Sequence, residues 1–376
     1  MSQTMDLITK LHQSFVYRKI EETDWESGTD GPLVVELDTT ESCDLACPGC
    51  ISQDIMETQN RFSDERLLEL GREMYEAGVK AVVLIGGGEP LAHPAVGDLM
   101  EYFGTHDMRI GITTNGTFIR KYLDIIAEYS SWTRVSMDAG SSELFNKLRP
   151  AKSGKGSRFD FIVENMEMLA KVKKGKLGYS YLIQTAADGP GVISNVNEIY
   201  QAAELARDIG CDYFEVKPSY QFREGADHAL VRHDSELMGA AKEEVERLEE
   251  LETDSFKIIR AINLKYSLED CEPVQLKSYK KCPATELRTL VCPSGAFVCP
   301  YWRGKEDMRI GELHNTSFAD MWNGARRKEV MNHLDASRHC HFYCLRHQSN
   351  EEVIKIIEKQ KSNEPVQLVE EFDRFI

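Results

Sequence analysis

The sequence predicts an α/β fold: a parallel sheet of six βα units, open or closed into a partial barrel, followed by a cysteine-rich α+β extension. Three observations predict it. Short apolar segments rich in β-branched residues alternate with longer amphipathic segments over about residues 33–220, which is typical of βα units. The alternation stops after residue 252, and six of the ten cysteines lie in the last third of the chain. Ligands of such folds gather at the carboxyl ends of the strands.

The elements are expected in this chain order. A helix from Met5 to about Lys19 and a polar loop precede the sheet. Ser63 can cap a later helix that Gly78 ends, because serine accepts a free N-terminal N–H and glycine tolerates the left-handed conformation after a helix. The strands are expected at Leu33–Leu37, Ala81–Ile85, Arg109–Thr113, Arg134–Met137, Leu177–Ile183 and Tyr213–Val216. Further helices are expected over 94–104, 118–129, 160–173, 195–210 and, as a charged spacer, 234–252.

The chain is expected to divide into five parts. Residues 1–32 form an N-terminal helix and loop, and residues 33–232 form the barrel or open sheet. A connecting helix (233–270) leads to the cysteine-rich region (271–348), in which Pro293-Ser294-Gly295 is the turn signal of a hairpin. A polar tail covers residues 349–376.

Composition and charge exclude some partners. Apolar residues make up 41% and charged residues 28%, which is ordinary for a globular protein. The net charge of −17 disfavours nucleic acid phosphates and anionic membrane surfaces. No apolar run reaches the ~18 residues of a membrane span, and no basic start followed by an apolar stretch marks a secretory signal. We therefore expect a cytoplasmic protein with no nucleic acid and no membrane partner.

Three cysteines, Cys43, Cys47 and Cys50, follow the first expected strand in the segment CDLACPGC. In a reducing cytoplasm, clustered cysteines indicate metal binding or catalysis before disulfides. Thiolates suit iron–sulfur clusters, which usually take four cysteines, so three would leave one iron open for another ligand. Structural zinc is the alternative, but zinc takes four ligands and no fourth cysteine or histidine is close in sequence.

This spacing resembles the radical S-adenosylmethionine (SAM) superfamily, whose members carry CxxxCxxC after the first strand of a partial (βα)6 barrel. Motifs at later strand ends match as well, including a GGEP motif whose carboxylate can accept bonds from an ammonium group. The family's usual aromatic residue before the last cysteine is Gly49 here. By this resemblance, the SAM-binding residues are Gly87, Gly88, Glu89, Pro90, Thr114, Asn115, Ser136 and Arg149, of which Ser136 and Arg149 would hold the SAM carboxylate.

The resemblance implies a partial (βα)6 barrel with SAM and one 4Fe–4S cluster on Cys43, Cys47 and Cys50. SAM would bind the open iron through its amino and carboxylate groups. An external reductant such as flavodoxin or ferredoxin would supply the electron that splits SAM into methionine and a 5′-deoxyadenosyl radical. That radical would take hydrogen from the substrate, while the protein orients the reactants and excludes water.

A second cysteine set lies in residues 271–348 and resembles the twitch and SPASM extensions, which hold auxiliary 4Fe–4S clusters. There are too few downstream cysteines for two clusters, so one cluster of the twitch kind is expected. Its ligands would be Cys299, Cys340, Cys344 and Cys282, with Cys292 as the alternative to Cys282. Structural zinc is again the alternative, since four thiolates at hairpin spacing also suit zinc.

The resemblance favours hydrogen abstraction from a small polar substrate, such as a sugar or aminocyclitol intermediate of natural-product biosynthesis, for dehydrogenation or epimerisation. A maturase that modifies a peptide or protein is the first alternative. A non-catalytic Fe–S or zinc scaffold is the second, although a scaffold needs no SAM motifs. Lys217, Glu215 and Gln184 lie at or near the ends of the last two expected strands and are the candidate catalytic residues.

Overall fold

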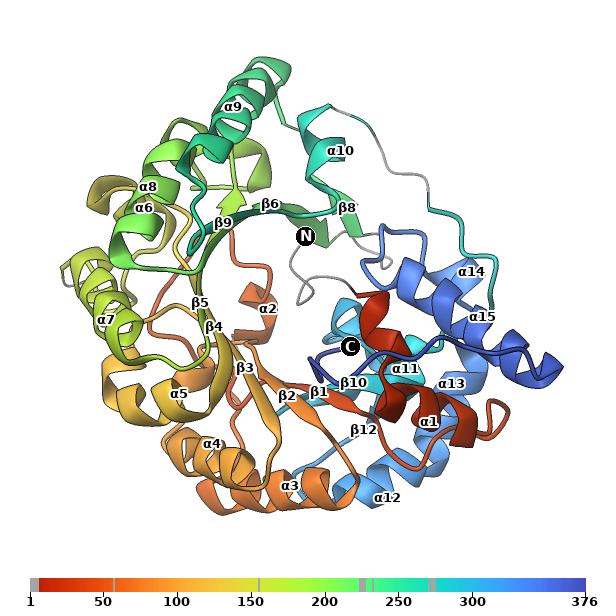
Figure 1. The fold of residues 1–376 in the computed structure, drawn as a ribbon. Coiled ribbons are helices and arrows are strands. Elements are labelled where there is room, and N and C mark those ends of the chain that lie inside the picture. The colour runs from red at the N-terminus through yellow and green to blue at the C-terminus, as the bar shows by residue number, and fades with distance from the viewer. Residues whose placement is uncertain are drawn as a thin grey trace.

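The computed structural model describes residues 7–56, 58–154, 156–222, 228–231, 233–269, 271 and 275–376. These residues form one strongly curved sheet in the order β12-β11-β10-β1-β2-β3-β4-β5-β6-β9, ringed by helices (Figure 1). Its strands are β1 (Val34–Leu37), β2 (Ala81–Leu84), β3 (Arg109–Thr114), β4 (Ser130–Ser136), β5 (Lys176–Ile183), β6 (Tyr213–Pro218), β9 (Lys257–Arg260), β10 (Arg288–Cys292), β11 (Gly295–Phe297) and β12 (Arg309–Gly311). A separate hairpin pairs β7 (Tyr220–Phe222) with β8 (His228–Leu230). The predicted α/β fold, a partial barrel with an antiparallel cysteine-rich extension, is confirmed.

The six predicted strands form the middle of this sheet, and neighbours run parallel from β1 to β6. β1 and β2 are buried along their whole length, as expected for parallel strands covered on both faces. β4 begins at Ser130 rather than at Arg134, because Trp132 and Thr133 already pair with β5.

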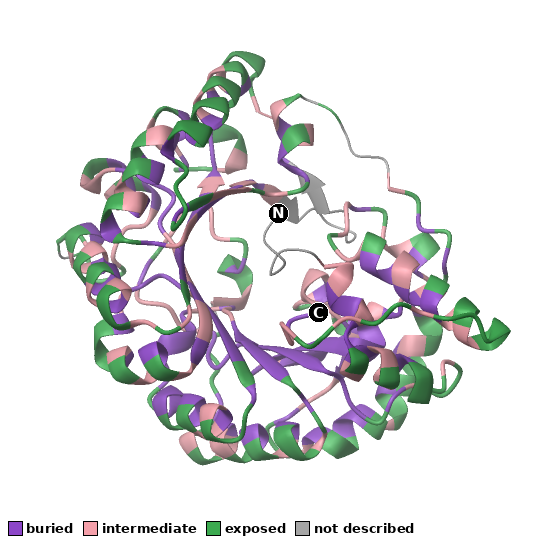
Figure 2. Ribbon diagram, in the orientation of Figure 1, coloured by how far each residue is buried: buried purple, intermediate pink, exposed green. Residues whose placement is uncertain are grey.

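Helices cover the outer face of the sheet, and Figure 2 shows exposed residues on their outer sides and buried residues in the strands. The Oγ of Ser63 accepts the N–H of Arg66 at 3.1 Å, and Gly78 adopts a φ of +82° after the helix, so both predicted helix signals are confirmed. The covering helices are α3 (Asp64–Glu76), α4 (Val96–Thr105), α5 (Leu123–Tyr129), α7 (Phe159–Val172) and α8 (Ile199–Ile209). Within the described ranges, no helix is long and apolar enough to cross a membrane.

Two strands extend the sheet beyond the six predicted ones. β9 follows α9 (Ser235–Arg247) in the region expected to hold only a connecting helix, and it pairs in parallel with β6. β10 is the first strand of the predicted hairpin and pairs in parallel with β1. The sheet of the barrel therefore continues directly into the cysteine-rich region. At the other end of the chain, the predicted N-terminal helix is divided into a 3-10 turn, η2 (Thr9–His12), and α1 (Ser14–Glu22).

The last residues of the chain cover the end of the barrel at which the strands begin (Figure 1). The Phe375 ring contacts Trp132, near the start of β4, with 5.5 Å between ring centroids. Arg374 pairs with Asp107, just before β3, at 2.9 Å. Asp373 pairs with Lys10 at 2.8 Å. These contacts cover the amino ends of the strands and leave the carboxyl ends as the place for a site.

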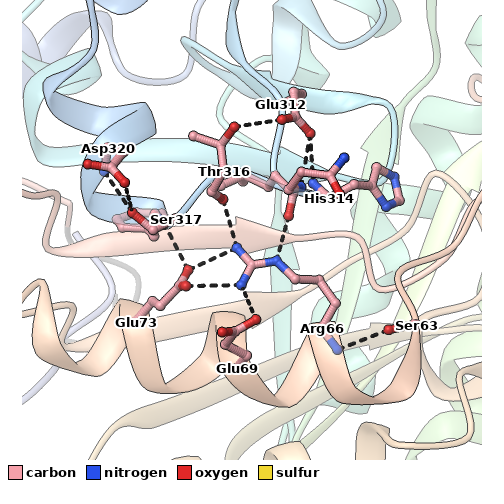
Figure 3. A network of polar contacts seen from close by, with 12 residues as sticks. Ser63, Arg66, Glu69, Glu73, Glu312, His314, Thr316, Ser317 and Asp320 are labelled. Carbon is pink, nitrogen blue, oxygen red and sulfur yellow. Dashed lines mark hydrogen bonds and ion pairs between the residues drawn. The ribbon is translucent and has the colours of Figure 1, made fainter.

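An arginine on α3 joins the barrel to the cysteine-rich region (Figure 3). Arg66 donates to the carbonyl oxygens of Leu313 at 2.7 Å and Thr316 at 2.8 Å. Its guanidinium also forms two hydrogen bonds with Glu73, at 2.9 and 3.0 Å. Glu73 in turn accepts the N–H of Phe318 at 2.8 Å. A bidentate arginine–carboxylate pair is rigid, so these contacts fix residues 313–318 against α3.

Candidate functional site

The three cysteines of the CDLACPGC segment lie in the loop that follows β1. The Sγ of Cys43 accepts the N–H of Leu45 at 3.4 Å and the side-chain amide of Asn115 at 3.7 Å. Burial raises the pKa of Cys43 to about 12 and that of Cys47 to about 11. Metal binding requires the thiolate form, so a bound cluster would favour deprotonation of these thiols.

Arg149 faces all three thiols. Burial opposes the charge of Arg149, but Asp138 and then Cys47, Cys43 and Cys50 raise its pKa. Thiolates that accept hydrogen bonds and have a cation beside them suit an iron–sulfur cluster. These residues therefore fit the 4Fe–4S cluster that the CxxxCxxC spacing implies.

The glycines after β2 allow two backbones to touch. A Cβ added at Gly88 would lie 2.2 Å from the carbonyl oxygen of Ser42, directly before Cys43. The N–H of Glu89 donates to the same oxygen at 2.9 Å. Only glycine permits such an approach, so the loop after β2 supports the cysteine loop as well as lining the cavity beside it.

Glu89 organises the ends of two strands. Its side chain accepts hydrogen bonds from the Thr114 hydroxyl at 2.6 Å, the Asn115 N–H at 2.7 Å and the Leu91 N–H at 3.1 Å. Pro90 follows as the first residue of the short helix η3 (Pro90–Ala92). Burial raises the pKa of Glu89 to about 7. Glu89 lines the cavity and retains acceptor capacity for one further donor.

Ser136, Asp138 and Arg149 all line the cavity. Asp138 pairs with Arg149 at 3.0 Å and accepts the N–H of Leu182 at 2.8 Å. Among the described residues, the Nε of Arg149 has no hydrogen-bond partner although it is buried. Sequence reasoning missed Asp138. Its φ of +57°, unusual outside glycine, marks a constrained turn after β4.

The cavity has a volume of about 2550 Å³ and runs inside the barrel from the cysteine loop to the second cysteine region. Cys43, Cys47, Cys50, Lys217 and Tyr301 all line it. It therefore extends from the first cysteine loop to Tyr301 and Leu345, which are close in sequence to Cys299 and Cys344.

Two of the three candidate catalytic residues form an ion pair in this cavity, and the third lies elsewhere in it. Lys217 lies 3.3 Å from Glu215, and Arg134 lies 2.9 Å from the same carboxylate. Burial opposes the ionisation of Glu215, but Arg134 and then Lys217 lower its pKa to about 2. Gln184 instead lies against the cysteine loop, since a Cβ added at Gly49 would be 2.6 Å from its Nε2. The side chain of Gln184 thus fills the space beside Gly49.

Four cysteines of the second region come together. Burial, followed by the Cys344 and Cys340 thiolates, raises the pKa of Cys282 to about 12. Burial and then Cys340, Cys344 and Cys282 raise the pKa of Cys299 as well. Asn350 donates to the Sγ of Cys282 at 3.2 Å.

Cys292 lies apart from this group. Its Sγ donates to the carbonyl oxygen of Gly295 at 3.1 Å and lies 3.3 Å from the Ser294 hydroxyl. Cys282 rather than Cys292 therefore accompanies Cys299, Cys340 and Cys344, and these four thiols have the donor chemistry of a 4Fe–4S cluster. In the part of the chain that the structure describes, no three His, Cys, Asp or Glu side chains are grouped to hold a single metal ion. Each thiolate of a cluster binds its own iron, which requires wider spacing.

Residues 37–185 match the family model described as the radical SAM superfamily. The mycofactocin maturase MftC of Mycolicibacterium smegmatis is 24% identical over 308 residues, which are 79% of this chain and 72% of that protein. The antilisterial bacteriocin subtilosin biosynthesis protein AlbA of Bacillus subtilis is 22% identical over 295 residues, covering 78% of this chain and 60% of AlbA. The crystal structure of Streptococcus suis SuiB with its precursor peptide SuiA aligns with a TM-score of 0.59 at 15% identity, covering 83% of this chain and 69% of SuiB. The chain, a barrel with a CxxxCxxC loop at the carboxyl ends of its strands, belongs to the radical SAM superfamily.

Proposed function

We propose that this radical SAM enzyme modifies a residue of a peptide. The observation that carries the proposal is the cavity volume of about 2550 Å³. Pockets for small ligands usually measure roughly 300–1,000 Å³. The cavity is larger than such pockets, and its lining extends from Arg109 and Lys176 at the strand starts to Lys217 near the strand ends, so it has room for a peptide segment beside SAM.

One group of cavity residues would hold the cluster, and a second group would bind SAM. Cys43, Cys47 and Cys50 would hold a 4Fe–4S cluster, which supplies the electron for reductive cleavage of SAM when reduced by a flavodoxin or ferredoxin. Around SAM, the Glu89 carboxylate would accept the ammonium group, and the free Nε of Arg149 would face the carboxylate. Thr114, Asn115 and Ser136 complete this polar wall, and the tight contact of Gly87 and Gly88 with the cysteine loop holds it in place.

The names of the relatives support a peptide over a small molecule. MftC is named as a maturase, and AlbA is named for bacteriocin biosynthesis. SuiB is similar only in fold, and its crystal structure is of a complex with a precursor peptide. The small polar substrate expected from the sequence becomes the second candidate, and the intact SAM motifs speak against a scaffold.

At the second region, Cys282, Cys299, Cys340 and Cys344 would hold an auxiliary 4Fe–4S cluster. The aromatic ring of Tyr301 lines the cavity and stacks on Phe342 with 4.6 Å between centroids. Such a cluster would accept an electron from the substrate radical left by hydrogen abstraction, or would anchor the site.

The decisive experiment uses anaerobically reconstituted, reduced protein with SAM. We expect 5′-deoxyadenosine release to rise when short peptides encoded near its gene are added, with a mass change in one of them. Stimulation by sugars or aminocyclitols, with unchanged peptides, would contradict the proposal. No 5′-deoxyadenosine under any condition would contradict SAM cleavage itself.

A further inference from the structure

We infer that the outer surface beside the first cysteine loop binds the electron donor, and that this donor is a small redox protein with carboxylates around its redox centre. Four cations, here called the basic patch, form this surface: Arg120, Lys121, Lys152 and Arg158. The inference rests on the proposed function, because it names the side from which the first cluster is reduced.

The basic patch contrasts with the acidic composition of the chain. The chain has 62 Asp and Glu residues against 45 Lys and Arg residues, yet residues 144–159 contain five cations and no acidic residue. Lys147 and Arg149 of this segment are paired with carboxylates of the fold, at 2.8 and 3.0 Å. Within the described ranges, Lys152 and Arg158 form no ion pair. Their charges are therefore available to a partner.

A pocket of about 450 Å³ brings three of the four cations together. Arg120, Lys121 and Arg158 line it, and Asp44 is the one carboxylate among its described lining residues. Arg120 pairs with Glu164 at 2.9 Å, but both side chains are solvent-exposed, and such pairs are weak. The pocket is therefore a local excess of positive charge on the surface of an acidic protein.

Two aromatic rings lie among these cations. Phe118 and Phe161 line the same pocket, and both are half-buried. The guanidinium carbon of Arg120 lies 4.8 Å from the centroid of the Phe161 ring. Aromatic residues and arginine are enriched in protein interfaces, whose rims are polar. The pocket therefore has the composition of a protein-binding surface rather than that of a solvated charged face.

The basic patch is bonded directly to the first cysteine loop. The N–H of Lys152 donates to the carbonyl oxygen of Asp44 at 2.8 Å. The side-chain amide of Asn115 donates to the Asp44 carboxylate at 2.7 Å and to the Sγ of Cys43 at 3.7 Å. A single side-chain amide therefore links the pocket to the Sγ of Cys43, so a donor bound there would lie next to the cluster position.

The donor and the substrate would use different sides of this loop. In the described chain, the pocket shares no lining residue with the large cavity that would hold SAM and the peptide. The donor is oxidised by one electron in each encounter, and this electron reduces the cluster in the cysteine loop. Because the two surfaces are separate, a bound peptide should leave donor binding unchanged.

Electrostatics decide which protein can approach. The net charge of −17 repels an acidic protein at long range, but at physiological ionic strength charge interactions decay over about 8 Å. The cations nearest the contact therefore determine the partner and its orientation. Electron-transfer complexes are weak and bury less than about 1,200 Å², so a patch of this size is sufficient for one.

The test compares two sources of electrons for reconstituted protein with SAM. One is a reduced flavodoxin with acidic side chains around its flavin, and the other is dithionite, a small reductant that needs no docking surface. In the double variant Lys121→Glu, Lys152→Glu, flavodoxin-driven release of 5′-deoxyadenosine should fall by about tenfold or more. Release driven by dithionite should stay unchanged. The matched control is Lys171→Glu, because Lys171 is exposed at the other end of α7 from Arg158, about 20 Å along the helix. It should affect neither reaction.

Binding is measured separately, by isothermal titration of oxidised flavodoxin into the oxidised, reconstituted protein. We expect the affinity to fall steeply between about 0.05 M and about 0.5 M salt, and the double variant to lose this dependence. Equal loss with both reductants, or undiminished flavodoxin binding by the double variant, would overturn the inference. So would displacement of flavodoxin by a glutamate-rich peptide, since the basic patch would then bind acidic peptides. No 5′-deoxyadenosine from the wild type with dithionite would instead contradict the proposed function, while the titration would still test the patch.

Discussion

The guanidinium of Arg303 lies 2.9 Å from the Asp38 carboxylate, which is fully buried. Asp38 follows β1 and precedes the first cysteine loop, whereas Arg303 follows Cys299 of the second set. A single buried ion pair thus joins the loops that carry the two cysteine sites. Burial raises the pKa of Asp38 to about 7 even though Arg303 opposes this effect.

Replacing Arg303 with methionine should destabilise the protein by about 3–5 kcal/mol, because it leaves a buried carboxylate without its partner. Asp38→Asn in the same chain should recover part of that loss, since the uncompensated charge is then removed. Urea unfolding of the single and double variants measures this coupling. Strictly additive effects would mean that the pair does not couple the two loops.

Iron analysis tests both cysteine sets. Reconstituted protein should hold about eight irons if each set binds a 4Fe–4S cluster. Alanine at Cys43, Cys47 and Cys50 together, or at Cys282 alone, should reduce the iron content by about half. Cys292→Ala is the matched control and should lose none, because Cys292 lies apart at Ser294. Zinc in place of iron at the second set would refute the auxiliary cluster.

Glu89→Gln should weaken SAM binding by about tenfold or more without loss of iron, because it removes the negative charge opposite the ammonium group. Thr114→Val is the companion variant, since it keeps the Glu89 carboxylate and removes the hydroxyl that donates to it at 2.6 Å and accepts the Gly116 N–H at 3.0 Å. We expect a smaller effect from it. Isothermal titration with SAM measures both, and an unchanged affinity for Glu89→Gln would show that Glu89 only orders the strand ends.

Alanine variants of Gly88 and Gly49 should differ sharply in whether they retain the first cluster. At Gly88 an added Cβ meets backbone atoms of Ser42, the nearest at 2.2 Å, and neither chain can move without displacing the cysteine loop. At Gly49 it meets the end of the flexible Gln184 side chain at 2.6 Å. Gly88→Ala should therefore lose the first cluster, whereas Gly49→Ala should keep it. The absorbance of the reconstituted clusters distinguishes them, and equal retention would contradict the packing argument.

Glu215 should stabilise the fold in a pH-dependent way. Its pKa of about 2 lies below the ordinary 4.5, so its stabilising effect is complete above pH 4.5 and is lost as the pH falls through 2. Relative to Glu215→Gln, the wild-type advantage should fall from about 3 kcal/mol at pH 7 to about 1 kcal/mol at pH 3. Urea unfolding at both values checks this, and a difference independent of pH would show that Glu215 is not held ionised by Arg134 and Lys217.

Local sequence signals predicted the repeating part of the fold. The strands from β1 to β6 have apolar, β-branched segments, and the cap at Ser63 and the helix end at Gly78 rest on the chemistry of single residues. β9 was missed because Lys257–Arg260 is short and only partly buried, so it lacks an apolar pattern. The pairing of β10 with β1 joins segments far apart in the chain, which no periodicity reveals.

The sequence predicted the site residues that lie together in one loop. It did not predict those that are brought together from distant parts of the chain. Cys43, Cys47 and Cys50 are recognised by their spacing alone. Asp138 has no such signal, because its ion pair with Arg149 forms only in the folded chain. Gln184 was expected to face the substrate because it ends a strand, and it lines the cavity with its amide beside Gly49. The position of a residue at a strand end predicts where its backbone lies but not which groups its side chain contacts.

The parallel pairing of β1 with β10 has a consequence for how this chain can be divided. Removing the cysteine-rich region would deprive β1 of a neighbour and expose a row of free N–H and C=O groups along a wholly buried strand. Such an edge recruits strands from other molecules. The region that carries the second set of cysteines therefore also covers the edge of the barrel sheet at β1. The barrel and the cysteine-rich region should fold as one unit.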